Sequence, residues 1–138
     1  MELIQWLEEE CNATVVMDVY GYCPYTFIDT TTEEGMFEGL ARRYLIETPM
    51  IRQSRGSVDT SINDIIKIVK LYDIDCVIGP GHMGHKEGAG CSGILREVCR
   101  DIGVPFLFLE FDLFDPRYTT MDKVKDRFLQ FFSTMEIG

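Results

Sequence analysis

Hydrophobic and polar residues follow two kinds of pattern along this chain. Three short runs are rich in β-branched, aromatic and other apolar residues, and they cover residues 13–20, 75–79 and 105–111. Runs of this length, bounded by Gly, Pro or Asp, are typical of buried strands. A fourth strand is expected around residues 50–52. The pattern therefore predicts a small sheet of three to four strands.

The segments around these runs have the spacing of amphipathic helices. Apolar residues recur every three or four positions over residues 3–7, 31–46, 57–73, 94–102 and 119–135. Thr31 and Glu34 have capping-box spacing, Thr119 is expected to cap the last helix, and Gly103 suits a C-terminal cap. Strands that alternate with helices imply a parallel sheet covered on both faces. The predicted fold is one α/β domain over residues 1–138, a Rossmann-like or flavodoxin-like three-layer sandwich.

Composition is that of an ordinary globular protein, with 46% hydrophobic and 26% charged residues. No apolar run approaches the roughly 20 residues of a membrane span. The first residues carry no basic region and no signal-peptide pattern. We therefore expect a cytoplasmic protein without membrane contact.

The net charge of −10 argues against nucleic acid as a partner. Only 13 Lys and Arg stand against 23 Asp and Glu, whereas a duplex-binding surface needs clustered cations. The same charge opposes long-range attraction of anionic substrates such as coenzyme A esters. A local field within a cleft can overrule that effect.

The five cysteines are odd in number and form no CxxC pair. This count argues against a disulfide framework and favours a reducing compartment. Cys76 and Cys99 lie in apolar patterns and are expected in the core. Cys23 and Cys91 stand beside loops and are the two candidates for chemistry.

Both histidines of the chain fall in one glycine-rich stretch, residues 79–91. This stretch follows a predicted strand and precedes a predicted helix, so we interpret it as a loop at the carboxyl edge of the sheet. Parallel topology would bring the segments that carry Cys23 and Asp112 to the same edge. The loop is therefore the main candidate for a functional site.

Several chemistries are open to this loop. His82, His85 and Cys91 could hold a metal ion, with Cys23 or Asp112 as a further ligand. The histidines could instead orient the loop or bind water.

A phosphate could also lie at the start of the following helix, near Gly84 and Lys86, although the glycine spacing matches neither a Walker A nor a G-x-G-x-x-G motif. A Cys–His hydrolase pair, Cys23 with His82 or His85, is a further alternative.

Two other polar groups are candidates for smaller roles. Arg52 and Arg55 form a local basic patch that could take a carboxylate or a phosphate, or remain solvated. Asp112, Asp115 and Arg117 are expected to form an ion-pair or turn network after the last strand.

The order of motifs resembles a known family. Residues 75–135 resemble the C-terminal end of the 2-hydroxyacyl-CoA dehydratase and benzoyl-CoA reductase subunit family, the D-component family. The motifs that carry the likeness are His82-Met83-Gly84-His85-Lys86, Gly103-Val104-Pro105, Leu109-Glu110-Phe111-Asp112 and Asp115-Pro116-Arg117, with Ala41-Arg42-Arg43-Tyr44-Leu45 upstream.

The resemblance implies Rossmann-like or flavodoxin-like domains assembled into dimers or larger complexes. It implies a [4Fe-4S] cluster, held by three cysteines of one subunit, near an acyl-CoA thioester. It further implies a partner subunit of the same family and an ATP-dependent activator that delivers one electron, so that a ketyl radical forms. Dehydration or ring reduction follows in that family.

Two departures modify this expectation. His85 stands where the family motif has a cysteine, and Cys91 lies farther along the next helix. The chain is also shorter than a full subunit, which favours a C-terminal domain or a small subunit that is inactive alone.

If His85 or Cys91 binds a cofactor, it does so without the other cluster cysteines that a full subunit of the family supplies. The alternatives are a non-catalytic relative that has lost the cluster and binds a partner or acyl-CoA, and a flavodoxin-like metal-binding protein. A homo-oligomer is also expected if a missing domain leaves apolar surface exposed.

Overall fold

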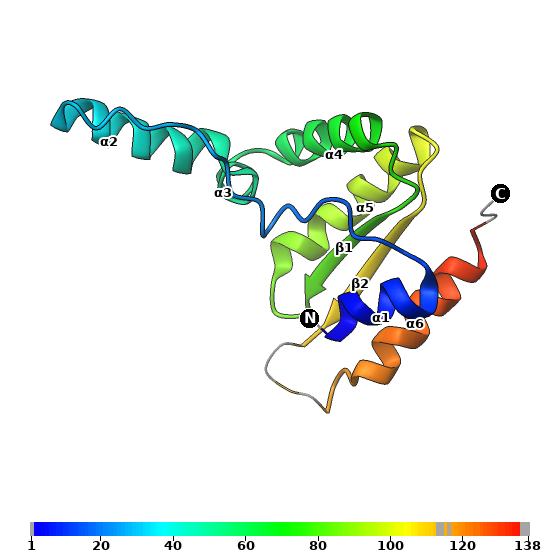
Figure 1. The fold of residues 1–138 in the computed structure, drawn as a ribbon. Coiled ribbons are helices and arrows are strands. Elements are labelled where there is room, and N and C mark those ends of the chain that lie inside the picture. The colour runs from blue at the N-terminus through cyan, green and yellow to red at the C-terminus, as the bar shows by residue number, and fades with distance from the viewer. Residues whose placement is uncertain (1, 113–114, 116, 136–138) are drawn as a thin grey trace. The chain divides into compact units, whose positions relative to one another are not determined.

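A computed structural model of the chain describes residues 2–112, 115 and 117–135 (Figure 1). In chain order the elements are α1 (Glu2–Cys11), α2 (Glu33–Arg42), η1 (Arg43–Glu47), α3 (Pro49–Arg55), α4 (Val58–Tyr72), β1 (Val77–His82), α5 (Lys86–Asp101), β2 (Phe106–Phe111) and α6 (Met121–Ser133). The chain divides into two compact units, each described by itself: residues 1–13 with 72–138, and residues 14–71. The single domain expected from the sequence stays a prediction.

The first unit is built on a parallel pair of strands. β1 and β2 run side by side from Val77 opposite Phe106 to His82 opposite Phe111, and α5 connects them. The strand predicted at residues 105–111 and the parallel pairing through a helix are confirmed, and the strand predicted at residues 75–79 is present but begins at Val77 and continues to His82. The protein is therefore mixed α/β, with a two-stranded sheet in the part of the chain that the structure describes.

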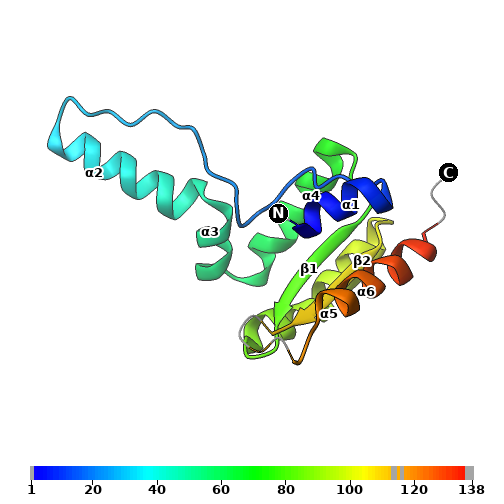
Figure 2. The same cartoon turned by 60° about the horizontal axis from the view of Figure 1, so that its bottom comes forward.

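The hydrophobic core of this unit lies between the strands and two helices that are distant in sequence. Leu7 of α1 and Phe128 of α6 pack with Leu107 and Leu109 of β2. α1 and α6 therefore cover one face of the pair, and α5 covers the other (Figures 1 and 2). Burying side chains of this size contributes about 1.5–3 kcal/mol each, which binds the N-terminal helix to the C-terminal half of the chain.

On the face toward α5, glycines make room for aromatic rings. A side-chain Cβ placed at Gly79 would lie 2.7 Å from Cζ of Phe106, and one at Gly81 would lie 2.2 Å from Cζ of Phe108. Both distances are far below van der Waals contact. The two glycines of β1 are therefore required by the phenylalanines of β2.

The ends of the helices in this unit follow simple backbone chemistry. Gly103 ends α5 with φ +76°, and the Val104 N–H donates to the Cys99 carbonyl at 2.8 Å, which is the hydrogen bond of a Schellman motif. The predicted C-terminal cap is confirmed. The cap of α6 is Thr120, whose hydroxyl accepts from the Lys123 N–H; Thr119, predicted from the sequence, lies one position too early.

Two of the predicted strands are wrong. Residues 13–20 form no strand, and residues 50–52 lie within α3. β-propensity describes how a side chain packs on a sheet, and residues 14–71 contain no strand that could pair with such a run. Pro49 does end the preceding helix, as expected, but it also occupies the first turn of α3, where its fixed φ is favourable.

In the second unit an extended segment packs along α2. Ile28 lies against Gly39, where a Cβ would come within 2.6 Å of the Ile28 Cγ2 atom. The cap of α2 is Thr32, whose hydroxyl accepts from the Gly35 N–H, so the predicted capping box beginning at Thr31 is wrong by one residue. The π-helical segment η1 continues α2 without a break, and the helix predicted for residues 31–46 is otherwise confirmed.

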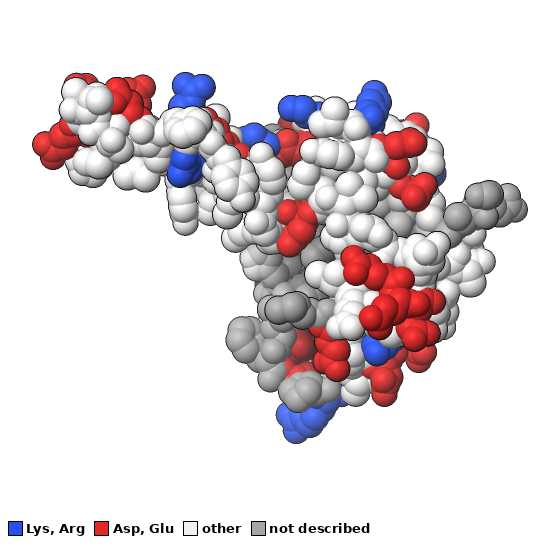
Figure 3. Space-filling model, viewed as in Figure 1, with Lys and Arg blue, Asp and Glu red and all other residues white. Residues whose placement is uncertain are grey.

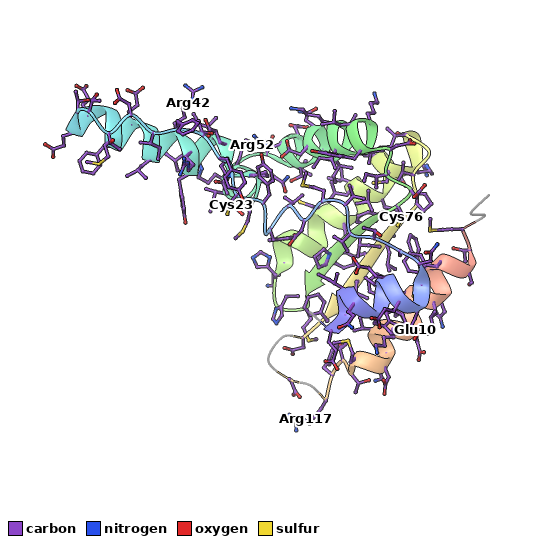
Figure 4. All side chains as sticks on the ribbon, in the orientation of Figure 1. Glu10, Cys23, Arg42, Arg52, Cys76 and Arg117 are labelled. Atoms are coloured by element: carbon purple, nitrogen blue, oxygen red, sulfur yellow. The ribbon has the colours of Figure 1, made fainter. Side chains whose placement is uncertain are left out.

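Arg52 connects α3 to α4. Its Nη2 atom lies 2.5 Å from Oδ1 and 2.6 Å from Oδ2 of Asp64, and Gln53 donates to the same carboxylate at 2.8 Å (Figure 4). Arg55 donates to the Leu45 carbonyl at 2.6 Å. The basic patch, for which solvated arginines or a bound carboxylate or phosphate were the alternatives, thus binds groups of its own unit.

Candidate functional site

The carboxyl ends of β1 and β2 form one polar edge, as parallel topology requires. His82 is the last residue of β1, and Asp112 follows the last residue of β2. The Met83 N–H donates to the Phe111 carbonyl at 3.2 Å and extends the ladder by one bond. The two side chains therefore project from neighbouring strand ends.

The ring of His82 has a defined orientation. The Gly84 N–H donates to Nδ1 at 3.1 Å, so Nδ1 acts as an acceptor and the neutral ring carries its proton on Nε2. Nε2 lies 3.4 Å from Oδ1 of Asp112, and both side chains are mostly buried. A Cβ at Gly84 would lie 3.1 Å from Cε1 of His82 and would press on the ring. Gly84 is thus part of the arrangement that holds the histidine.

Asp112 is held in turn by the backbone that follows it. The Asp115 N–H donates to Oδ1 of Asp112 at 3.2 Å. Arg117 forms an ion pair with Asp115, with Nη2 2.7 Å from Oδ2 (Figure 4). The expected turn network is confirmed for these residues. Hydrogen bonds from the Arg117 side chain and backbone lower the pKa of Asp115, and the Asp115 carboxylate raises the pKa of Arg117.

The stretch predicted as a long loop is mostly regular structure. β1 continues to His82 and α5 begins at Lys86, which leaves only residues 83–85 as a turn. The His85 N–H donates to the His82 carbonyl at 2.8 Å and closes this turn. The five glycines of the stretch lack positive φ, so they do not serve as left-handed loop positions.

His85 and Lys86 stand at the start of α5 with exposed side chains. His85 is the N-cap residue, and its side chain makes no capping hydrogen bond. Its Nδ1 atom lies 3.8 Å from the position that a Cβ at Gly88 would take. Lys86 occupies the first helical position. The phosphate site predicted near Gly84 and Lys86 stays a prediction.

Cys91 is half-buried within α5, more than one turn beyond His85. Among the residues described, no three His, Cys, Asp or Glu side chains come together as a group that could hold a metal ion. A metal site formed by His82, His85 and Cys91 stays a prediction, and the structure shows no such group of side chains among the described residues.

The remaining cysteines divide by exposure. Cys99 is fully buried, as expected, and burial raises the pKa of its thiol. Cys76 is half-buried beside β1, where burial and the neighbouring Asp75 raise the pKa of its thiol (Figure 4). Cys23 is exposed in the second unit. The proposed Cys23–histidine hydrolase pair stays a prediction.

A second polar region was not anticipated from the sequence. A cavity of about 450 Å³ lies beside β2 and is lined in part by Arg96 of α5 and by Lys123 and Arg127 of α6. The only sequence signal was the spacing of Lys123 and Arg127, four residues apart and hence on one face of a helix.

These features define a mixed α/β protein with a β–α–β unit that carries a histidine–carboxylate pair at the carboxyl edge of its parallel strands. The comparison with protein families gives the next step. The chain belongs to the 2-hydroxyglutaryl-CoA dehydratase D-component family, whose model matches residues 1–135. This finding confirms the family inferred from the motifs. Searches of curated proteins and of solved structures found no match.

Among the described residues, no helix has the length and apolar character needed to cross a membrane.

Proposed function

We propose that this chain is a domain or small subunit of a dehydratase-like complex that acts on acyl-CoA thioesters, and that it is inactive alone. In such a complex it would pair with a subunit of the same family and receive electrons through an ATP-dependent activator. The observation that carries the proposal is the family match over nearly the whole chain.

The edge around His82 and Asp112 is the part of the chain best suited to face a substrate. Strand ends of parallel sheets are where open α/β proteins bind ligands. His82 has a fixed tautomer, with Nε2 toward Asp112 at 3.4 Å. A histidine held in this way could orient a substrate oxygen after a small movement of either side chain.

The iron–sulfur cluster of the family does not fit the residues described. A cluster needs several thiolates around one point. Here His85 occupies the position of the motif cysteine, Cys91 is half-buried farther along α5, and the described residues supply no group of three ligands. If the complex holds a cluster, its ligands therefore come mainly from the partner.

The same observation favours a second candidate function. A relative that has lost the cluster could bind a partner subunit or an acyl-CoA and regulate or stabilise the complex without catalysis. Replacement of the motif cysteine by His85 fits this alternative as well as the first.

Anaerobic purification followed by iron and acid-labile sulfide analysis tests the proposal. The isolated chain is expected to contain iron far below one atom per chain. A tagged form is expected to retain a same-family subunit under the same conditions. The complex with that subunit is expected to dehydrate or reduce an acyl-CoA when activator, ATP and reductant are present.

Variants at positions 85 and 86, at the start of α5, test whether this turn lies beside a cluster. His85→Cys restores the motif residue, and a rise in bound iron in the complex would place position 85 beside a cluster. Lys86→Ala is the matched control, since it changes the adjacent exposed residue and is expected to leave iron unchanged. Stoichiometric iron in the isolated wild-type chain would contradict the assignment of the ligands to a partner. A complex that forms but lacks activity would favour the non-catalytic alternative.

A further inference from the structure

The pair of strands in the first unit has two outer edges, and the ladder between the strands decides which backbone groups face them. The Val77 N–H donates to the Pro105 carbonyl at 2.9 Å, and the Met83 N–H donates to the Phe111 carbonyl at 3.2 Å. Successive residues of a strand direct their backbone groups to opposite sides. Odd-numbered residues of β1 and β2 therefore face the neighbouring strand, and even-numbered residues face outward.

The outer edge of β1 is protected against a further strand. Pro80 faces this edge and has no N–H to donate, and the edge of a sheet is where a strand tolerates proline. The carbonyl of His82, which faces the same way, already accepts from the His85 N–H at 2.8 Å. These features leave β1 poorly suited to pair with another strand.

The outer edge of β2 lacks this protection. Phe106, Phe108 and Glu110 face outward, and each offers one N–H and one carbonyl. In the part of the chain that the structure describes, these backbone groups have no hydrogen-bond partner. An edge with unpaired groups in a row is a template for one more strand.

The cavity of about 450 Å³ shows that this edge has room for such a strand. It is bordered, among others, by Arg96 of α5, residues 108–110 of β2, and Lys123 and Arg127 of α6, and by none of the residues of β1. α5 and α6 cover opposite faces of the strand pair (Figure 2). A space that reaches both helices without β1 therefore lies around the outer edge of β2. A strand added there would be covered on both faces, as strands of parallel sheets are.

Positive charge is in excess around this cavity. Arg96, Lys123 and Arg127 are its three cations, against the two carboxylates of Glu110 and Asp126. None of these cations forms an ion pair or a side-chain hydrogen bond with another described residue. Elsewhere on the same unit acidic side chains gather over α1 (Figure 3). The edge of β2 therefore favours a negatively charged occupant.

The same charges disfavour a second copy of this chain at the edge. Two copies aligned edge to edge would bring the three cations of one copy toward those of the other. Like charges across an interface repel, and charged side chains beside an exposed edge are a common protection against self-association. An acidic strand would meet attraction in place of this repulsion.

We propose that the outer edge of β2 binds an extended acidic segment of a protein partner as a third strand. The backbone groups of Phe106, Phe108 and Glu110 would pair with it, which is recognition by strand addition. Its side chains would alternate between the two faces. Acidic ones would lie toward Lys123 and Arg127 of α6, and apolar ones toward the ring of Phe108 on the face of α5. The proposal rests on this edge and not on the proposed function.

Short peptides added to the full chain test the nature of the occupant. The probe is a peptide of alternating valine and glutamate, and a peptide of alternating valine and lysine is the charge-reversed control. A peptide of alternating proline and glutamate keeps the negative charge, but proline at every second position prevents a strand. Fluorescence anisotropy of labelled peptides is expected to show saturable binding of the valine–glutamate peptide, at least about tenfold tighter than either control.

Amide hydrogen exchange measured by NMR tests where the peptide lies. In the free chain the amides of Phe108 and Glu110 face outward, so they are expected to exchange faster than those of Leu107 and Leu109, which face β1. A saturating amount of the valine–glutamate peptide is expected to slow exchange at Phe108 and Glu110 by at least about tenfold. Leu107 and Leu109 are the internal reference.

Two substitutions of one residue separate the backbone from the charge. Glu110→Pro and Glu110→Gln both remove a carboxylate from the cavity, but only proline also removes the outward N–H. The hydrogen bonds to β1 come from odd-numbered residues, so both variants are expected to keep the strand pair. Glu110→Gln should bind the valine–glutamate peptide at least as tightly as wild type. Glu110→Pro should bind it about three- to tenfold more weakly than Glu110→Gln, the effect of one hydrogen bond.

A substitution on α6 tests the cations. Arg127→Gln is expected to weaken binding of the valine–glutamate peptide about threefold or more, because one charge beside the acidic side chains is lost. Arg100→Gln changes an exposed arginine of the same unit that does not line the cavity, and binding is expected to stay within about twofold of wild type. Far-ultraviolet circular dichroism checks that all variants are folded.

Several results would overturn the proposal. They are binding of either control peptide as tight as that of the valine–glutamate peptide, no binding of that peptide, unchanged exchange at Phe108 and Glu110, and equal affinities of Glu110→Pro and Glu110→Gln. Slower exchange at the same amides with rising protein concentration and no peptide would also overturn it, because a second copy would then occupy the edge. If Glu110→Pro does not fold, the peptide comparison and the exchange measurement decide. These results are independent of the iron, partner retention and activity measured for the dehydratase-like complex.

Discussion

Substitution of Gly81 by alanine is expected to destabilise the first unit, against the usual preference for alanine over glycine. A Cβ at this position would lie 2.2 Å from Cζ, 2.6 Å from Cε2 and 3.1 Å from Cε1 of Phe108. One added methyl group thus overlaps most of the outer edge of an aromatic ring. The ring or strand β1 must shift to accommodate it.

The expected magnitude follows from this overlap. Overpacking by a single methyl group in a close-packed region costs about 1–3 kcal/mol. Removing a glycine from a strand would otherwise gain about 0.5–1 kcal/mol. We therefore expect a net loss of about 1–2 kcal/mol in the free energy of unfolding, a shift of about 1 M in the urea midpoint at ordinary slopes.

The single tryptophan makes the assay specific for this unit. Trp6 of α1 packs against the core cluster, so its fluorescence reports unfolding of the unit that contains β1 and β2. Gly93→Ala is the matched control. It lies in α5 with no atom within 4 Å of an added Cβ, so alanine should stabilise by about 0.5–1 kcal/mol. Both substitutions replace glycine by alanine, and they are expected to change the free energy of unfolding in opposite directions.

A second variant tests the cause. Trimming the ring by Phe108→Leu should make Gly81→Ala less costly, giving a coupling energy of about 0.5–3 kcal/mol in a double-mutant cycle. Gly81→Ala with wild-type stability, or strictly additive losses in the cycle, would refute the packing explanation.

Three further predictions concern other parts of the chain. Thr120→Ala should lower the stability of the first unit by about 1 kcal/mol, because it removes the cap of α6, and an unchanged urea midpoint would contradict this. A thiol reagent should label Cys23 rapidly in the native state and Cys99 only after unfolding, since burial shields Cys99 and raises its pKa; equal rates would contradict the assigned exposures. Arg117→Ala should return the lowered pKa of Asp115 toward its ordinary value in a carboxyl NMR titration. A carboxyl group whose pKa is lower in the folded than in the unfolded protein stabilises the fold above its unfolded-state pKa, and this stabilisation is lost as the pH falls through its folded-state pKa. In mildly acidic solution the wild type should therefore keep a contribution from Asp115 that Arg117→Ala lacks, and identical titrations of Asp115 in both forms would argue against it.

The parts of the fold that were predictable are those set by local pattern and parallel topology. β2 is a continuous apolar run ending in acidic residues, and its pairing with β1 through a helix follows from the chain order. The same rule predicts that His82 and Asp112 lie at one edge of the sheet, where the structure has them 3.4 Å apart. Cys99 was expected in the core because of its helical spacing, and it is fully buried.

The predictions that failed needed information from outside each segment. Residues 13–20 have the composition of a strand, but a strand exists only where a neighbour supplies hydrogen bonds, and the unit from 14 to 71 contains none. The cavity was missed for a related reason. Arg96 and Arg127 lie far apart in sequence, and only the packing of α5 and α6 beside β2 brings them to one site.

The glycines of residues 79–91 show how a local pattern can be right in composition and wrong in its explanation. High glycine content there suggested a flexible loop closing on a ligand, yet Gly79 and Gly81 belong to a strand and lie under phenylalanine rings of β2. Phe108, the ring that Gly81 accommodates, also lines the cavity beside β2. A glycine at position 81 therefore lets β2 lie close to β1 with the aromatic side chain of Phe108 in place. Glycine-rich sequence at a strand end thus has two physical explanations, a backbone that approaches a ligand and a backbone that approaches a ring, and here the strand pairing and the Cβ distances favour the second.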